Sequence, residues 1–149
     1  MKNLADNKKA LFDYEILETY QAGLVLSGFE AKAVLSGKAN LRSSFVIIRG
    51  NEAFLMNVDI APYQAKNTPP GYEQSRTRKL LLTKKELAEL AGKVSQHGLT
   101  LIPISLYTVR HKIKLSFGLA KSRKKFEKRE HIKEREFKKQ KDRILKASF

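Results

Sequence analysis

Residues 83–119 read TKKELAELAGKVSQHGLTLIPISLYTVRHKIKLSFGL and combine a helix pattern with two strand patterns. The hydroxyl of Thr83 can cap the first turn while Glu86, three residues later, reaches back to it, which is the capping-box arrangement. Gly98 then supplies the left-handed residue that helices favour just past their ends. Apolar residues follow at helical spacing, namely Leu87, Leu90, Ala91 and Val94. The sequence therefore predicts one well-defined helix whose apolar stripe packs on a core.

The second half of this stretch predicts two strands. Residues 99–109 and 113–119 are rich in Ile, Leu, Val and Tyr, and they turn near residues 110–112. Upstream, residues 45–48 and 53–56 form short apolar runs on either side of a Gly-Asn pair at residues 50 and 51. Such a pair between apolar runs is a turn signal, so these residues predict a β-hairpin that lies over the core.

The N-terminal part of the chain predicts one further long strand. Residues 12–27 alternate as a strand, and Gly23 within them indicates a bulge where the strand bends. A short helical turn is expected near residues 29–35, and residues 62–71 contain prolines that cannot continue a ladder and so predict a loop projecting from the body. Five or six strands with one inserted helix predict a mainly β fold, an OB-fold-like closed β-barrel.

Composition narrows the class of protein. The chain has 149 residues and no cysteine, so one domain with its own core is expected and disulfide scaffolds and thiolate metal sites are excluded. Its three histidines have no metal-site spacing, and we expect neither a metal nor a cofactor. No run is long and apolar enough for a membrane span, and the first residues lack a signal-peptide pattern, which favours a cytoplasmic protein.

Charge divides the chain into two parts. The net charge of +15 separates into +7 for residues 1–120, with 17 basic and 10 acidic side chains, and +8 for residues 121–149, with 13 and 5. The second part contains only five large apolar residues, too few to offset the backbone entropy of folding. We therefore predict a body at 1–120 and a basic C-terminal tail at 121–149 that is disordered when free and helical when bound; a solvated helix or a flexible solubilising tail is the alternative.

A polyanion is the partner that this charge favours. Basic residues of the body gather in three clusters, at residues 8–9, at 32–42 and at 76–79, and tyrosines that could stack unpaired bases are interspersed with them. No phosphate loop, nucleophile elbow or persuasive catalytic carboxylate pair is present. The sequence therefore predicts a protein that binds RNA or DNA and is not an enzyme. For Glu30, a structural role beside a basic side chain is favoured over hydrogen bonding to a guanine base.

Short motifs spread from residue 7 to about residue 137 resemble the SsrA-binding protein (small protein B, SmpB) family in their order and spacing. They are NKKA at 7–10, DY at 13–14, AGLVL at 22–26, GFEAK at 28–32, GKANL at 37–41, RTRKLLL at 76–82, GLTLIP at 98–103, GLAK at 118–121, KRE at 128–130 and IKER at 132–135. Each motif is weak alone, but together they are specific.

The resemblance implies an OB-fold body that binds the tRNA-like domain of transfer-messenger RNA (SsrA), and no covalent chemistry. It implies delivery of the alanyl-charged RNA, with elongation factor Tu and GTP, to stalled bacterial 70S ribosomes. The tail would then occupy the empty decoding centre and mRNA channel, so that the nascent chain is tagged for degradation and the ribosome is rescued.

Carried onto this chain, the resemblance implies two sets of residues. The expected RNA-binding residues are Asn7, Lys8, Lys9, Glu30, Lys32, Arg78, Lys79, Lys121, Arg123, Lys124 and Lys125. The expected ribosome-engaging residues of the tail are Glu127, Lys128, Arg129, His131, Ile132, Lys133 and Arg135.

This chain departs from the family pattern in three places. Residues 122–124 read SRK where the family has Gly-Lys-Lys, and Glu127 replaces an Asp; both changes keep size or charge roughly intact. Residues 72–75 read YEQS where the family has His-Asp-Pro, so we assign that loop no role. Two other functions remain open at the level of sequence: a structural ribosomal protein, which would also be small, basic and tailed, and a nuclease with an OB body, which would need a carboxylate cluster or a metal site.

Overall fold

The computed structural model describes residues 2–64, 66, 68–123, 135, 136, 138 and 139. The described chain is mainly β with one principal helix, which confirms the predicted fold class at that level. Its elements are β1 (Lys2–Asp6), α1 (Lys8–Asp13), β2 (Tyr14–Leu24), α2 (Gly28–Leu35), β3 (Ala39–Asn40), β4 (Phe45–Arg49), β5 (Glu52–Met56), β6 (Asp59–Ile60), β7 (Arg78–Leu81), α3 (Lys84–His97), β8 (Thr100–Val109) and β9 (Lys112–Ser122).

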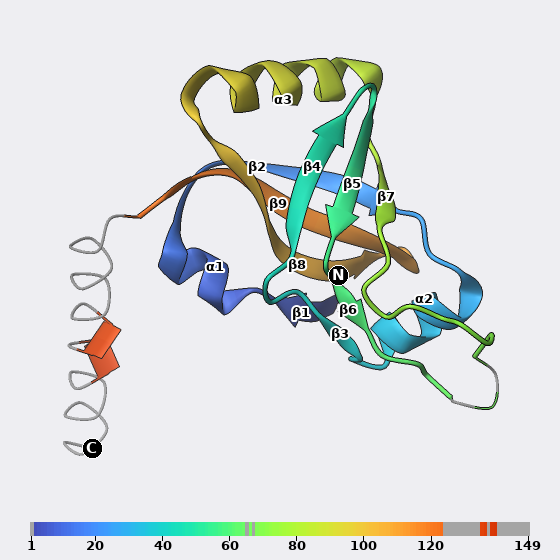
Figure 1. The fold of residues 1–149 in the computed structure, drawn as a ribbon. Coiled ribbons are helices and arrows are strands. Elements are labelled where there is room, and N and C mark those ends of the chain that lie inside the picture. The colour runs from blue at the N-terminus through green and yellow to red at the C-terminus, as the bar shows by residue number, and fades with distance from the viewer. Residues whose placement is uncertain (1, 65, 67, 124–134, 137, 140–149) are drawn as a thin grey trace.

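The strand pairings form a circuit. One sheet has the order β1-β8-β4-β5-β7-β2-β9, and β8 also pairs with β9, so the ladder returns to its second strand. Strands β3 and β6 pair separately as a short ribbon. All pairs are antiparallel, and α3 lies across one end of the sheet, between β7 and β8 in the chain (Figure 1).

The locally encoded elements form as the sequence predicts. Thr83 and Glu86 make the capping box of α3, and Gly98 ends this helix with a φ of 62°. Leu90 is fully buried, and Leu87 and Val94 pack against the same core. Ala91 is exposed, so the buried apolar stripe of this helix is narrower than predicted.

The two predicted hairpins are also present. β4 and β5 pair from Phe45–Met56 to Arg49–Glu52, which leaves Gly50 and Asn51 as a two-residue turn. β8 and β9 pair along most of their lengths, but β9 continues to Ser122, beyond the predicted strand end and the predicted limit of the body.

The N-terminal prediction is wrong in two respects. Phe12 and Asp13 belong to α1, and the long strand runs only from Tyr14 to Leu24 and not from residue 12 to residue 27. The bulge does not lie at Gly23, which is paired in register with both Leu81 and Lys114; the register of β2 against β9 shifts instead between Ile16 and Glu18. Gly23 has a different constraint, because a Cβ there would lie 3.3 Å from Cδ1 of Leu81.

The N-terminus adds a strand that the sequence analysis did not predict. β1 pairs with β8 along the edge of the sheet, and Asn7 then links it to α1. Helix α1 has only six residues and its N-cap makes no side-chain capping bond, so it lacks a strong local signal. The Asn7 amide instead donates to the carbonyl of Pro103 at 2.9 Å, and its backbone N–H donates to the carbonyl of Ile104 at 2.9 Å.

The buried apolar residues form one large core and a second, smaller cluster of Ala10, Ile102 and Ala120. The fully buried large side chains of the large core come from α2, from α3, from several strands and from the connections that follow β3 and β5. They are Val34, Leu41, Leu55, Val58, Ile60, Leu80, Leu90, Leu106, Leu115 and Phe117. Only Asn7, Glu30, Ser44 and Arg78 are buried polar or charged residues among the described ones. Two of these, Glu30 and Arg78, bind each other.

Candidate nucleic-acid interface

Helix α2 carries a buried carboxylate at its first turn. Glu30 follows Ser27 by three residues, and its Oε1 accepts from the Ser27 backbone N–H at 3.1 Å and from the Ser27 hydroxyl at 2.9 Å. On the other side, Oε2 accepts from Nε of Arg78 at 2.9 Å and from its Nη2 at 2.6 Å. The Glu30 and Arg78 side chains have no exposed surface, so this ion pair lies in the interior.

Two further side chains complete the cluster. Arg76, whose side chain is 37% exposed, binds the Glu30 carboxylate through both Nε and Nη2. The Tyr72 hydroxyl donates to the carbonyl of Ile60 at 2.9 Å and accepts from Arg78 at 3.1 Å. The Tyr72 ring also meets Phe29 of α2 edge to face, with 4.9 Å between centroids.

The guanidinium groups keep the Glu30 carboxyl ionised. Burial alone would raise its pKa, but hydrogen bonds from Arg76, from the Ser27 backbone and from Arg78 outweigh burial and lower the pKa to about 2. Burial also raises the pKa of the Tyr72 hydroxyl. The cluster therefore holds a fixed negative charge between two fixed positive charges.

This cluster ties the loop at residues 61–77 to helix α2. Arg78 donates to the backbone carbonyl of Val58, before the loop, at 2.9 Å and to that of Gln74, within the loop, at 3.0 Å. Tyr72, Gln74 and Arg76, which follow the predicted projecting loop at residues 62–71, therefore pack on the body. Glu30 and Arg78 themselves present no atom to the surface, so in this conformation they position the surrounding surface and do not touch a ligand.

The remaining candidates around α2 are exposed. Lys32 lies on the exposed face of α2, and Lys79 follows Arg78 on β7. Lys79 forms an ion pair with Glu52 at 3.4 Å in which both side chains are about half exposed. Lys32 makes no ion pair with any described residue.

A second group of candidates surrounds α1. Lys8 and Lys9 are exposed, while Asn7 is buried and bonded to β8 as described above. Lys121 lies at the end of β9 and pairs with Glu15 at 3.3 Å. Arg123 is half-buried: its backbone N–H donates to the carbonyl of Asp13 at 2.9 Å and its Nε to that of Tyr14 at 3.2 Å. These bonds hold the residue after β9 against the end of α1.

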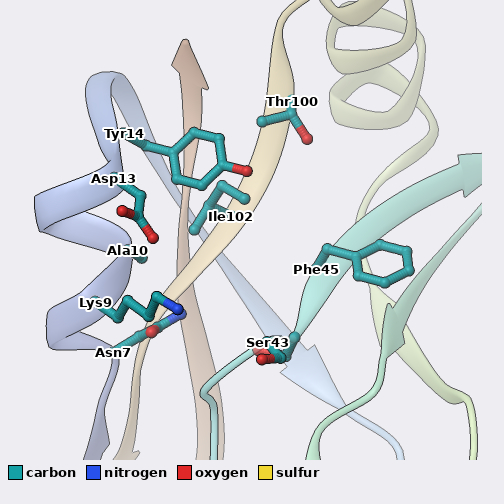
Figure 2. A pocket seen from close by; sticks show the side chains of 10 residues that line it. Asn7, Lys9, Ala10, Asp13, Tyr14, Ser43, Phe45, Thr100 and Ile102 are labelled. Atoms are coloured by element: carbon teal, nitrogen blue, oxygen red, sulfur yellow. The ribbon is translucent and has the colours of Figure 1, made fainter. Parts of the chain in front are cut away.

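A hollow of about 330 Å³ opens beside this group. Figure 2 shows Lys9, Asp13 and Tyr14 on one wall and Ser43 with Phe45, at the start of β4, on the other. Its lining is Asn7, Lys9, Ala10, Asp13, Tyr14, Ser43, Ser44, Phe45, Thr100 and Ile102. The hollow is mixed in character, with an amine, a carboxylate and hydroxyls around apolar side chains.

The predicted RNA-binding residues thus fall into two groups and not one. Asn7, Lys8 and Lys9 lie with Lys121 and Arg123 near α1, whereas Glu30, Lys32, Arg78 and Lys79 lie near α2. Figure 1 shows these two helices on opposite sides of the sheet in that view. The candidates at Lys124, Lys125, Glu127, Lys128, Arg129, His131, Ile132 and Lys133 lie outside the described residues. Arg135 is described, with helical backbone and an exposed side chain.

Sequence analysis missed the roles of Tyr72 and Arg76. Both lie more than 40 residues from Glu30, so no local pattern connects them. The available signal was Glu30 three residues after Ser27, because a capping-box carboxylate points back toward the helix start and whatever packs there.

The described residues contain neither a metal-binding group nor a membrane-spanning helix. No three or more His, Asp or Glu side chains are grouped as metal ligands there. None of the described helices combines the length and apolar character needed to cross a membrane.

Comparisons with known proteins agree with one another. The family model described as SmpB protein matches residues 4–147. The SsrA-binding protein of Thermosynechococcus vestitus is 47% identical over 146 residues, covering 98% of this chain and 96% of the relative. The SsrA-binding protein of Cupriavidus necator is 46% identical over 144 residues, covering 97% and 96%.

A solved structure is also similar. It is described as "tmRNA-SmpB: a journey to the center of the bacterial ribosome", is 45% identical, and superposes with a TM-score of 0.66 over 80% of this chain and 84% of its own. With a family match across nearly the whole chain and relatives of this identity, the protein belongs to the SmpB family.

Proposed function

We propose that this protein binds transfer-messenger RNA and delivers it to stalled bacterial ribosomes in trans-translation. The observation that carries the proposal is the family match over residues 4–147, together with relatives named for SsrA binding and a solved structure named for tmRNA, SmpB and the ribosome. The net charge of +15 supports a polyanionic partner.

The body is the part that holds the carried RNA. Lys8, Lys9, Lys32 and Lys79 offer exposed ammonium groups to phosphates. Glu30 and Arg78 fix the shape of the surface from within, and Asn7 anchors the start of α1 on β8. Lys121 and Arg123, followed by Lys124 and Lys125, continue the basic surface into the tail. The circuit of strands described above supports a closed barrel of OB type as the scaffold.

The tail is the part that engages the ribosome. Glu127, Lys128, Arg129, His131, Ile132, Lys133 and Arg135 are proposed to contact the empty decoding centre and mRNA channel. Residues 121–149 carry +8 but few apolar side chains, so ordering there needs an anionic partner. The helical backbone of residues 135, 136, 138 and 139 is consistent with a tail that forms a helix when bound.

The reaction chemistry belongs to the partners of this protein. Charged transfer-messenger RNA would carry alanine and would travel with elongation factor Tu and GTP, and the ribosome would form the peptide bond. This chain would act by docking, through fixed charges and a stable body. Tagging of the nascent chain and rescue of the ribosome would follow from correct placement of the RNA.

A double charge reversal in the tail tests this division of labour. Lys128→Glu combined with Arg129→Glu should leave binding of transfer-messenger RNA by the full chain unchanged and should abolish tagging on stalled ribosomes. The control is Lys84→Glu with Lys85→Glu, the same charge change on the exposed start of α3, which should keep both activities. If the tail variant loses RNA binding, the two parts do not have separate partners.

Sedimentation separates a delivery factor from a structural ribosomal protein. A delivery factor leaves ribosomes during a high-salt wash, because its contacts with RNA are largely electrostatic. Retention of the full chain on washed ribosomes at the stoichiometry of a ribosomal protein would contradict the proposal.

A further inference from the structure

The turn between β8 and β9 has a backbone conformation that is unfavourable for the two residues that form it. Val109 pairs with Lys112, so Arg110 and His111 alone form the two-residue loop. Their φ angles are 50° and 67°, in the left-handed region that Gly, Asn and Asp tolerate best. A hairpin of this geometry would be more stable with Asn and Gly at these two positions. Arg110 and His111 therefore place two large exposed polar side chains at the tip at a cost in backbone strain.

An apolar hollow of about 510 Å³ lies next to this tip. Leu24, Leu26 and Leu81 line it from the β2 and β7 side, Leu35 from α2, and Ile113 from β9. Leu35 is 46% exposed and Leu81 is 55% exposed, so part of this apolar surface faces solvent. His111 also lines the hollow and stands at its edge with Lys112.

The rim of the hollow carries positive charge without partners. Arg110 lies in the turn, and Lys112 and Lys114 follow it on β9. Lys2 lies with Arg110 and His111 along an adjoining hollow. None of these four cations forms an ion pair with any described residue, whereas Lys79, Lys93 and Lys121 elsewhere on the body do. A cluster of unpaired cations around an apolar floor complements a phosphate joined to a flat apolar group.

We propose that the Arg110–His111 tip and the adjoining hollow form a binding site for one unstacked nucleotide of the carried RNA. The base lies in the hollow against the Leu35 and Leu81 side chains and the His111 ring, and the flanking phosphates contact Arg110 and Lys112. Imidazole and guanidinium planes are both established stacking partners for splayed-out bases. This inference rests on the proposed function, since it names a contact within the same RNA complex.

The position of the tip favours the carried RNA, and not ribosomal RNA, as the source of this nucleotide. β9 begins beside the tip and ends at Ser122, where Arg123 is bonded to the end of α1. Figure 1 shows this strand crossing from the side of α2 to the side of α1. Eleven residues of strand span roughly 35 Å. If the tail enters the ribosome from one end of β9, the tip at the other end faces the RNA that is delivered.

The test replaces the tip with the turn that the backbone prefers. In the full chain, Arg110→Asn with His111→Gly should keep or raise the melting temperature, because both positions have positive φ. Its affinity for a transcript of transfer-messenger RNA, measured at about 150 mM salt, should fall roughly tenfold or more, the scale of one stacked base and its phosphate contact. A turn with only a structural role would show the higher stability without the loss of affinity.

Two more variants distinguish a specific binding site from a general effect of positive charge on RNA affinity. Lys85→Gln removes one positive charge from the exposed start of α3 and should change the RNA affinity less than about twofold. Leu81→Glu places a carboxylate at the exposed edge of the hollow and should weaken RNA binding without unfolding the chain. Chemical footprinting should show one unpaired nucleotide that the wild-type chain protects and the tip variant does not.

The outcomes identify which idea fails. If the wild-type chain does not bind transfer-messenger RNA, the proposed function is wrong. If the wild-type chain binds this RNA, but the tip variant and Leu81→Glu bind it as tightly as the wild-type chain does, only the proposed nucleotide site is wrong. If the tip variant keeps its RNA affinity but loses binding of a poly-glutamate peptide that the wild-type chain binds, the surface takes an acidic protein segment, which also overturns this inference.

Discussion

The Glu30 carboxylate and the Arg78 guanidinium form an ion pair with an N–O distance of 2.6 Å, and neither side chain has exposed surface. A buried pair contributes less to stability than its short distance suggests, because both ions lose hydration on folding. Removing one partner is different, since the other charge then stays in the interior without compensation. The loop at residues 61–77 and helix α2 are held together through this pair.

Replacing Arg78 should therefore destabilise the whole body. Arg78→Met keeps most of the side-chain volume but leaves the partly exposed Arg76 as the one cation bound to Glu30 among the described residues, and should lower the free energy of unfolding by about 3 to 5 kcal/mol. Lys79→Met, one residue later, removes a cation from an exposed pair and should cost about 1 kcal/mol or less. Urea denaturation of the two variants gives both values. Equal effects would mean that burial of the pair has no importance.

Stability should fall in acid through the Glu30 carboxyl. Its pKa is about 2 in the folded protein against an ordinary value of 4.5, so its contribution is fully present above pH 4.5 and is lost as the pH falls toward 2. The contribution is on the order of 3 kcal/mol. Glu30→Gln should be less stable at neutral pH, and its stability should depend less on pH between about 5 and 2 than that of the wild-type chain. Parallel pH profiles would contradict this assignment.

Two glycines should respond to alanine in opposite directions. A Cβ at Gly118 would lie 2.7 Å from Cγ2 of Ile16 and 3.2 Å from Cδ1 of Ile104, so Gly118→Ala should destabilise the body by about 1 to 3 kcal/mol. Gly92 lies in α3 with open space where a Cβ would go, and Gly92→Ala should stabilise the protein by roughly 0.5 to 1 kcal/mol. Thermal unfolding of the two single variants provides the comparison.

Binding of the carried RNA should depend steeply on salt. If the body neutralises about six phosphates, the affinity should fall roughly a thousandfold between 50 and 200 mM salt. Arg110→Asn should reduce the slope by about one unit in log affinity against log salt if this side chain contacts a phosphate. Titrations at four or five salt concentrations give the slope, and a flat response would exclude an interface built on phosphates.

The parts of the fold that the sequence predicted are those encoded by neighbouring residues. The capping box at Thr83 and Glu86, the left-handed Gly98 and the turn at Gly50 all depend on residues within a few positions of each other. Each forms as expected. The family motifs likewise led to the family that the comparisons show.

The parts that the sequence did not predict depend on distant residues. Asn7 is bonded to Pro103 and Ile104, and only this contact shows why the chain turns into α1 at that point. The bulge in β2 falls near Leu17 and not at Gly23, because register is determined by the partner strand β9. The buried cluster joins Glu30 to residues 42 to 48 positions away. No window of sequence contains both sides of such contacts.

The pairing of β2 with β9 has a consequence for how the body folds during synthesis. Tyr14 pairs with Ser122, and Lys2 of β1 pairs with Thr108, so the first strands made find their partners among the last. Such non-local pairing slows folding, because a long loop must close before the contacts stabilise it. The growing chain therefore keeps its N-terminal strand edges unpaired until nearly the whole body has been made, and that interval is when it is most exposed to aggregation.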